Sequence, residues 1–369
     1  MSKESLINRK HIVLRMMIIV FIIILVLSIL LAVTIGAVKI PLGDVYRIVL
    51  YNATHFKIGS IETGILIGDL DFASKGTMYE IVWNVRMPRV MMGAIVGVLL
   101  AMCGVVMQAT VQNPLADPYI LGISSGASLG ATFSIMVGAS AIFTGFLATM
   151  GTAFWAFLGA LGAMALVMTL AHIGGGRITS AKLVLAGCVV GSLCGAFTNI
   201  IVYIGQDAEN MKNVTYWLMG SLVSIQPEDV EFAIGPIVIG MIPLFLLRWR
   251  INLLTVGEEE ALSMGIDTSK LRFVVIVCAT LLTSISVAIS GVIGWIGLVI
   301  PHFCRMIFGY DYRRLIPTNI LFGATFLIIV DNVARMATTA EIPIGILTSF
   351  IGAPVFVYLI LTGGAIRGD

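Results

Sequence analysis

The chain has 369 residues, of which 59% are hydrophobic and only 11% are charged, and its formal net charge is +2. Soluble domains are roughly 45–50% apolar and about 25% charged. So few charges cannot cover a globule of this size, which excludes a soluble enzyme, and the small net charge gives no indication of nucleic-acid binding. The composition predicts an all-α polytopic membrane protein in contact with lipid.

Long runs without charge predict about ten membrane-spanning helices. The first run, Met16 to Val38, is too long for the apolar part of a signal peptide and is expected to be retained. Runs of 59 residues between Asp117 and Arg177 and of 32 residues between Arg272 and Arg305 each hold two spans, since about 20 residues cross the hydrocarbon. The second run is so short that one of its helices is expected to be short or irregular. The predicted spans are residues 16–38, 90–111, 118–138, 147–171, 184–204, 232–248, 272–290, 293–308, 315–333 and 345–363.

The positions of the basic residues predict the orientation of these spans. Fourteen of the 22 Lys and Arg residues fall on the side of the N-terminus, and six of the other eight lie in the segment 39–89. Because short cytoplasmic loops are rich in Lys and Arg, both termini are predicted to be cytoplasmic and the segment 39–89 external. We therefore expect one transmembrane domain, 1–369, in the cytoplasmic membrane.

Motifs for catalysis and metal binding are missing from the sequence. The five cysteines lie in apolar runs without CxxC spacing, and there is neither a His/Cys cluster with ligand spacing nor a P-loop. The G-x-S-x-G match around Ser124 opens a predicted transmembrane helix, whereas a nucleophile elbow needs a strand before the serine. We predict no catalytic residue, no metal site and no bound cofactor, so any ATP would be hydrolysed on a partner.

Charged residues at the outer ends of the spans are the first candidate site. Arg86 and Arg89 flank Pro88 before the second span, where basic residues are least expected, and predict a fixed positive charge that docks a partner or attracts an anion. Interfacial snorkelling of these side chains is the alternative. Asp331 and Arg335, spaced i,i+4, can pair on one face of the ninth span. The middles of the spans hold almost no ionisable residue, which speaks against an ion-coupled secondary carrier.

Small residues recur at four-residue spacing in two predicted spans and indicate close helix contacts. A pathway-lining role is the alternative for the second stripe, because Ser192, Thr198 and Asn199 lie close to it. Gln108, near the inner end of the second span, could hydrogen-bond across the bundle or line a path. The stripes consist of Gly122, Gly126 and Gly130 in the third span and of Gly187, Gly191 and Gly195 in the fifth.

Two inner segments stand out. Asp117 and Pro118 suit the first positions of the third helix, as N-cap and N1 residues. The segment 253–270 predicts a short amphipathic helix with three acidic residues on an otherwise basic side, which is either a surface for a partner or a solvated helix face. Its candidate contact residues are Glu258, Glu259, Glu260, Ala261, Leu262, Met264 and Gly265.

Taken together, the motifs resemble those of the FecCD-like permease subunits of ABC importers for iron-siderophores, haem and cobalamin. The resemblance covers residues 16–366, and the motifs occur in the family's order. They are Arg86–Arg89, Gly104 through Gln108 to Asn113–Pro118, Leu121–Ala127, Trp217–Ser221, Gly294–Arg305, and Asp331–Arg335 followed by Glu341–Gly345 and Gly352–Pro354.

The resemblance implies a homodimer or pseudo-dimer around one central pathway, two cytoplasmic ATPase subunits that bind ATP and Mg²⁺, and an external substrate-binding protein that delivers a bulky metal chelate. By motif it assigns docking of that protein to Arg86, Arg89 and Arg335, and ATPase coupling to the segment 253–270. It assigns the fifth helix and the loop after it to the pathway and gate. The external segment looks longer than is usual in the family, from about Asn52 to Lys75.

Overall fold

We describe a computed structural model of the chain. The structure describes residues 3–36, 38–58, 61–63, 75–138, 151–173, 179–205, 207–223, 225–256, 258–338 and 341–361. Each predicted span contains a helix, and seven helices in these ranges are long and apolar enough to cross a membrane. The span helices are α1 (Lys3–Thr34), α5 (Met87–Val111), α6 (Ile123–Thr132), α8 (Thr152–His172), α9 (Ser180–Ile204), α11 (Pro227–Leu246), α14 (Thr268–Ser290), α15 (Ile296–Phe308), α16 (Tyr312–Ala337) and α17 (Ile344–Leu361).

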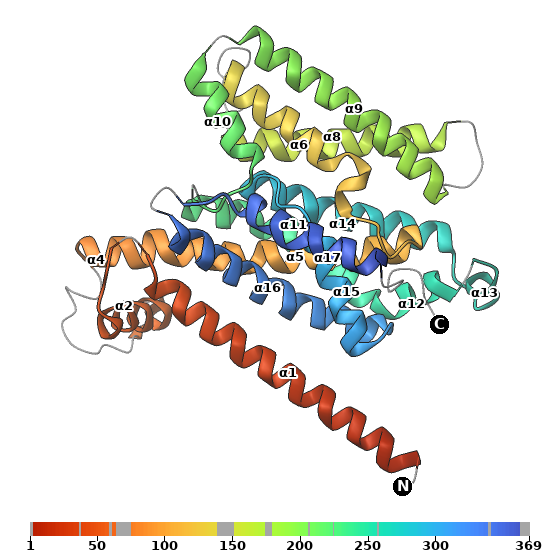
Figure 1. Cartoon of the computed structure of the whole chain (residues 1–369), viewed down its shortest axis with the longest axis horizontal. Helices are drawn as coiled ribbons and strands as arrows, with labels where there is room; N and C mark the ends of the chain where they lie inside the picture. The colour runs from red at the N-terminus through yellow and green to blue at the C-terminus, as the bar shows by residue number, and fades with distance from the viewer. Residues whose placement is uncertain are drawn as a thin grey trace.

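Short elements occupy the two ends of the bundle (Figure 1). The outer end holds α2 (Leu42–Thr54), a hairpin of β1 (Phe56–Ile58) and β2 (Ile61–Thr63), α4 (Thr77–Tyr79), and α10 (Ala208–Leu218). The inner end holds α12 (Arg248–Val256) and α13 (Glu258–Ser263), together with the beginning of α1 and the end of α17. The beginning of α1 and the end of α17 therefore lie on one side, as the basic residues predict.

The second span is longer than its sequence suggests. A π-helical turn (Glu80–Arg86) joins α4 to α5, so that one continuous helix runs from Thr77 to Val111. The last part of the predicted external segment 39–89 is thus a helical extension of the span. The stretch from about Asn52 to Lys75, which looks long for the family, lies largely outside the described residues.

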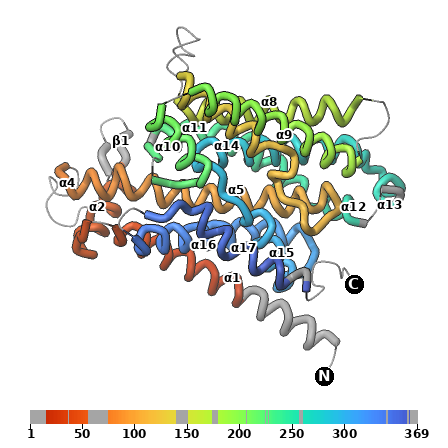
Figure 2. Tube along the Cα trace, turned by 45° about the horizontal axis from the view of Figure 1, so that its top comes forward, coloured from red at the N-terminus to blue at the C-terminus, as the bar shows by residue number. Residues whose placement is uncertain are grey.

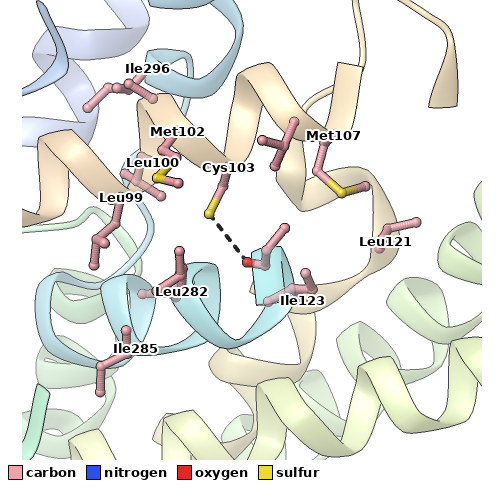
Figure 3. Packing of buried hydrophobic residues seen from close by; sticks show 14 of the residues in the cluster. Leu99, Leu100, Met102, Cys103, Met107, Leu121, Ile123, Leu282, Ile285 and Ile296 are labelled. Atoms are coloured by element: carbon pink, nitrogen blue, oxygen red, sulfur yellow. Dashed lines mark hydrogen bonds between the residues drawn. The ribbon is translucent and has the colours of Figure 1, made fainter. Parts of the chain in front are cut away.

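Helix α5 forms the centre of the protein and runs through the middle of the bundle (Figure 2). Its side chains are buried along almost the whole helix. Figure 3 shows Leu99, Met102 and Cys103 of α5 against Leu282 and Ile285 of α14, with the Cys103 thiol donating to the Ala279 carbonyl at 3.3 Å. Helices α14, α15 and α16 pack most extensively against it, while α6, α8 and α9 pack on one another.

Glycines allow α5 to approach its neighbours at backbone distance. A Cβ added at Gly97 would lie 2.2 Å from the carbonyl oxygen of Gly323 in α16, and one at Gly104 would lie 1.9 Å from that of Gly297 in α15. Lipid provides no hydrophobic drive for helix association, so such close packing has to hold the bundle together. Gly104 and Gly297 belong to the sequence motifs, whereas Gly97 and Gly323 lie outside them.

The third span is broken, although the sequence predicts one helix from 118 to 138. Asp117 accepts a hydrogen bond from the Tyr119 N–H and starts a 3₁₀ turn (Pro118–Leu121), which confirms its predicted capping role. Gly122 then adopts a left-handed conformation with φ of 73°, and α6 begins at Ile123. Gly122 packs against the backbone of Gly187 and Gly191 in α9, where a side chain would not fit.

The pair α14–α15 confirms the expectation that one of its helices is short, with 23 and 13 residues. Trp295 precedes α15 with a φ of 73°, a conformation that is costly for a bulky residue. Its indole packs on Gly352 of α17, where an added Cβ would lie 2.4 Å from Trp295 Cγ. The Gly294–Arg305 and Gly352–Pro354 motifs therefore fit together as one packing unit.

Candidate functional site

An ion-pair cluster lies at the outer end of the bundle. Arg89 in the first turn of α5 donates from Nε and Nη2 to Asp331 of α16, at 3.0 and 2.8 Å, and from Nη1 to Glu341 at 2.8 Å. Arg335, one turn after Asp331, places its Nε 3.1 Å from the second carboxylate oxygen. The predicted i,i+4 pair is thus confirmed, and Asp331 is shared between two arginines.

Arg335 of this cluster and the neighbouring Arg86 also hold the end of α1. Arg86 donates to the carbonyls of Val33, Thr34 and Val38, and Arg335 Nη1 donates to those of Ala32 and Ile35. The last carbonyls of a helix lack hydrogen-bond partners within the helix. They also form the negative end of the helix dipole, which attracts cations. Arg86 and Arg335 therefore fasten the end of α1 to α5 and α16, while Arg89 joins α5 to α16 through Asp331.

The structure buries the arginines that the sequence predicts as a fixed positive charge at the outer mouth. Arg86 and Arg89 are only 5% and 8% exposed, and the Arg335 side chain is 4% exposed. Buried guanidinium groups require partners, and this chain supplies two carboxylates and a helix end. Docking through Arg86, Arg89 and Arg335 remains a prediction, but these residues do not form an exposed basic patch in this structure.

The predicted pathway residues divide into two groups. Gln108 is buried and donates to the Gly297 carbonyl at 3.2 Å, and Thr198 is buried and donates to Cys194 of its own helix. Gly187 packs at backbone distance against Ile120. Gln108 and Gly187 thus make contacts between helices and Thr198 bonds within α9, and all three are buried in this structure.

The second group shares one face of α9. Ser192 and Asn199 are exposed, an added Cβ at Gly195 would meet no atom within 4 Å, and Cys188 one turn earlier is also exposed. Gly191 lies between the groups, because its added Cβ would touch Ser125 at 3.4 Å. The small-residue stripe in α9 is thus a packing surface at one end and an unoccupied surface at the other.

An apolar groove of about 620 Å³ opens near the end of α10. Its walls come from the first half of α17, the end of α10 and the turn before α15, and none of its lining residues is charged. They are Leu218, Met219, Val292, Gly294, Gly345, Ile346, Ser349, Phe350 and Ala353. The segment that follows the fifth span therefore contributes to a groove.

The inner acidic segment forms the short helix α13. Ala261 is buried and anchors this helix, whereas Glu260, Leu262 and Met264 are exposed, and Gly265 ends the helix with a φ of 78°. The side chains of Glu258 and Glu259 lie outside the described residues. Exposed apolar side chains on a charged helix at the membrane surface suit a protein partner.

A second groove, of about 470 Å³, adjoins α13. Met264 and Gly265 form one wall, while Trp249, Arg250 and Lys270 bring an aromatic ring and two basic groups from α12 and α14. Asp267 caps α14, and its pKa is lowered, mainly by the hydrogen bond from the Lys270 backbone N–H. The inner surface thus offers a mixed apolar and charged contact area.

Some functional contacts could not be found from sequence spacing. Glu341 is the second carboxylate bound to Arg89 and adopts a left-handed φ of 51°. Asn252 of α12 donates a hydrogen bond to Asp311, which precedes α16. Both lie far along the chain from their partners. The only signal in the sequence is that Glu341 opens a motif, which gives no partner for it.

The comparisons with known proteins agree with this architecture. The FecCD transport family matches residues 24–362. The chain is 41% identical over 282 residues to an iron chelatin transport system permease protein of Helicobacter pylori, covering 76% of this chain and 82% of the relative. It is 38% identical over 288 residues to the molybdate import system permease protein MolB of Haemophilus influenzae, covering 77% and 83%.

A solved structure is also similar along almost the whole chain. It is described as an inward-facing conformation of a metal-chelate type ABC transporter, and it superimposes with a TM-score of 0.76 at 32% sequence identity. The match covers 94% of this chain and 99% of that one. Family membership sets aside the ion-coupled secondary carrier: the chain belongs to the FecCD transport family and is a multi-pass membrane permease subunit of an ABC transporter, with ATP hydrolysis on a separate subunit.

Proposed function

We propose that the permease imports a bulky metal chelate, such as an iron-siderophore, haem or cobalamin, by alternating access. The observation that carries this proposal is the wide groove of about 620 Å³, whose lining residues are apolar or uncharged. A large ligand with a shielded metal passes such a surface without binding tightly to it. A relative that carries iron chelatin and a structure of the metal-chelate type support the same ligand class.

Molybdate is the second candidate, because one relative is a molybdate permease. A small oxyanion needs hydrogen-bond donors or cations along its way, and the groove lining contains no basic side chain. The test is uptake into proteoliposomes that contain the permease, its ATPase and its binding protein. We expect ATP-dependent accumulation of a radiolabelled iron chelate that excess molybdate does not reduce. Accumulation of molybdate alone would exclude the chelate.

We further propose that two copies of this chain surround one pathway, with the exposed face of α9 and the groove as its walls. A binding protein then docks over the outer end. An acidic side chain of that protein can reach Arg89 only if it displaces Glu341, because Glu341 is the more exposed of the two carboxylates on Arg89, with 30% of its side chain accessible against 3% for Asp331.

The pathway assignment of α9 predicts a labelling pattern. In a chain with Cys188→Ser, cysteines introduced as Ser192→Cys and Asn199→Cys are expected to react with a membrane-impermeant maleimide, because water reaches a pathway surface. The control is Val26→Cys on α1, an apolar position that is also exposed and that should face lipid and stay unlabelled. Equal labelling at all three positions, or none at 192 and 199, would contradict the assignment.

We propose that the ATPase subunits bind the inner surface formed by α13, the start of α14 and, from α12, Trp249 and Arg250. Met264→Glu is expected to abolish copurification of the ATPase, because Met264 is 61% exposed and a charge there would enter an apolar contact. Met211→Glu is a matched control on the outer α10, where the methionine is 41% exposed. If both variants retain the ATPase equally, the docking surface lies elsewhere.

A further inference from the structure

Helix α16 connects the two functional ends of the protein. It runs from Tyr312 to Ala337, about 39 Å at 1.5 Å per residue. Its outer end carries Asp331 and Arg335 of the ion-pair cluster, and its inner end lies beside α12. A helix of this length, with polar contacts at both ends, can carry a displacement across the membrane.

Among the described residues of α12, Asn252 makes the side-chain hydrogen bonds of this inner contact. Its Nδ2 donates to Asp311 Oδ1 at 3.0 Å, and its Oδ1 accepts from the Tyr312 backbone N–H at 2.8 Å. Asp311 is the N-cap of α16, and its pKa is lowered to about 2, mainly by the hydrogen bond from Arg313 and further by that from Asn252. The carboxylate is therefore ionised at physiological pH, and both polar atoms of the Asn252 amide bind the first turn of α16.

Helix α5 is attached to the same inner element. Gln112, which ends α5 in a left-handed conformation with a φ of 53°, donates to the Leu254 carbonyl of α12 at 2.7 Å. At the outer end α5 is bound to α16 through Arg89 and Asp331, and between the ends the two helices cross at Gly97 and Gly323. Together α5 and α16 form a two-helix unit that holds α12 at one end and the ion-pair cluster at the other.

We propose that Asn252 is a positioning residue that couples movement of the ATPase-facing segment α12–α13 to the outer ion-pair cluster through α16. The proposal rests on the proposed ATPase contact at α13. When the ATPase subunits move α13, the adjoining α12 moves the start of α16 through Asn252. The displacement then reaches Asp331 and the Arg89–Glu341 contact, where the external protein would bind.

The experiment uses the assembled transporter with its ATPase and binding protein. Asn252→Asp sets a second carboxylate against Asp311, and Asn252→Ala removes both hydrogen bonds without adding charge. In both variants we expect the ATPase to copurify normally and to hydrolyse ATP. Chelate transported per ATP should fall roughly tenfold, within the usual range of coupling between sites, and stimulation of hydrolysis by the binding protein should be lost.

The double variant Asn252→Asp/Asp311→Asn supplies the rescue. It exchanges the amide and the carboxylate, restores a donor opposite an acceptor and keeps an N-cap residue at 311, so transport per ATP should recover. Unchanged coupling in Asn252→Ala, or a double variant no better than Asn252→Asp, would overturn the inference. Failure of the proposed ATPase contact would show separately, as Met264→Glu retaining the ATPase.

Discussion

Asp331→Ala is expected to destabilise the protein more than any other change in the outer cluster. Asp331 is 2% exposed and is the shared partner of Arg89 and Arg335. Removing one partner of a buried ion pair costs about 3–5 kcal/mol, because the remaining charge is left without compensation. Here two guanidinium groups lose their carboxylate, while Glu341 can neutralise only Arg89.

Thermal unfolding of the purified protein in detergent measures this effect, with a large decrease in the midpoint temperature as the expected result. The matched control is Asp44→Ala in α2, whose partner Arg47 lies 3.6 Å away with a half-exposed side chain. Exposed pairs contribute about 0–1 kcal/mol, so that midpoint should change little. Similar midpoints for the two variants would mean that the cluster does not stabilise the folded state.

The spans and their orientation could be predicted because they depend on local composition and on charge position. Ten helices lie where uncharged runs predict them, and the Asp117 cap and the Asp331–Arg335 pair depend on residues close in sequence. The membrane links sequence to structure here, because a spanning helix must form all its backbone hydrogen bonds within itself. It must also be apolar over about 20 residues.

The burial of the motif arginines could not be predicted, because their partners are distant along the chain. Arg89 and Asp331 are 242 residues apart, and Arg86 binds the end of a helix 48 to 53 residues earlier. Position alone cannot distinguish an exposed arginine at the end of a span from one that folds back on its own chain. A docking role and a structural role both favour basic residues at this place.

The glycine stripes show the same limit. Gly187, Gly191 and Gly195 have identical spacing, but Gly187 meets the backbone of Ile120 and Gly195 meets no neighbour within 4 Å. The sequence indicates that a close approach is possible along the stripe, and the tertiary packing decides where it occurs. Gln108 is a similar case. The sequence predicts two roles for it, and the structure contains the hydrogen bond across the bundle.

Gly104→Ala is the second substitution with a large expected effect. The added methyl group would lie 1.9 Å from the Gly297 carbonyl oxygen and 2.5 Å from its Cα, so the backbone of α15 would have to move. That oxygen also accepts the hydrogen bond from Gln108, one turn further along α5. Overpacking a core costs about 1–3 kcal/mol when side chains can adjust, and a backbone clash should reach or exceed the upper value.

The control is Gly162→Ala in α8, where the added methyl group meets no atom within 4 Å and alanine is the better helix former. Its unfolding midpoint should be unchanged or slightly raised, while that of Gly104→Ala should fall strongly. Gly297→Ala provides an independent check, because its methyl group would lie 2.7 Å from the Pro118 ring. A stable Gly104→Ala variant would show that α15 can withdraw from α5, and that the glycine motif has a role other than close packing.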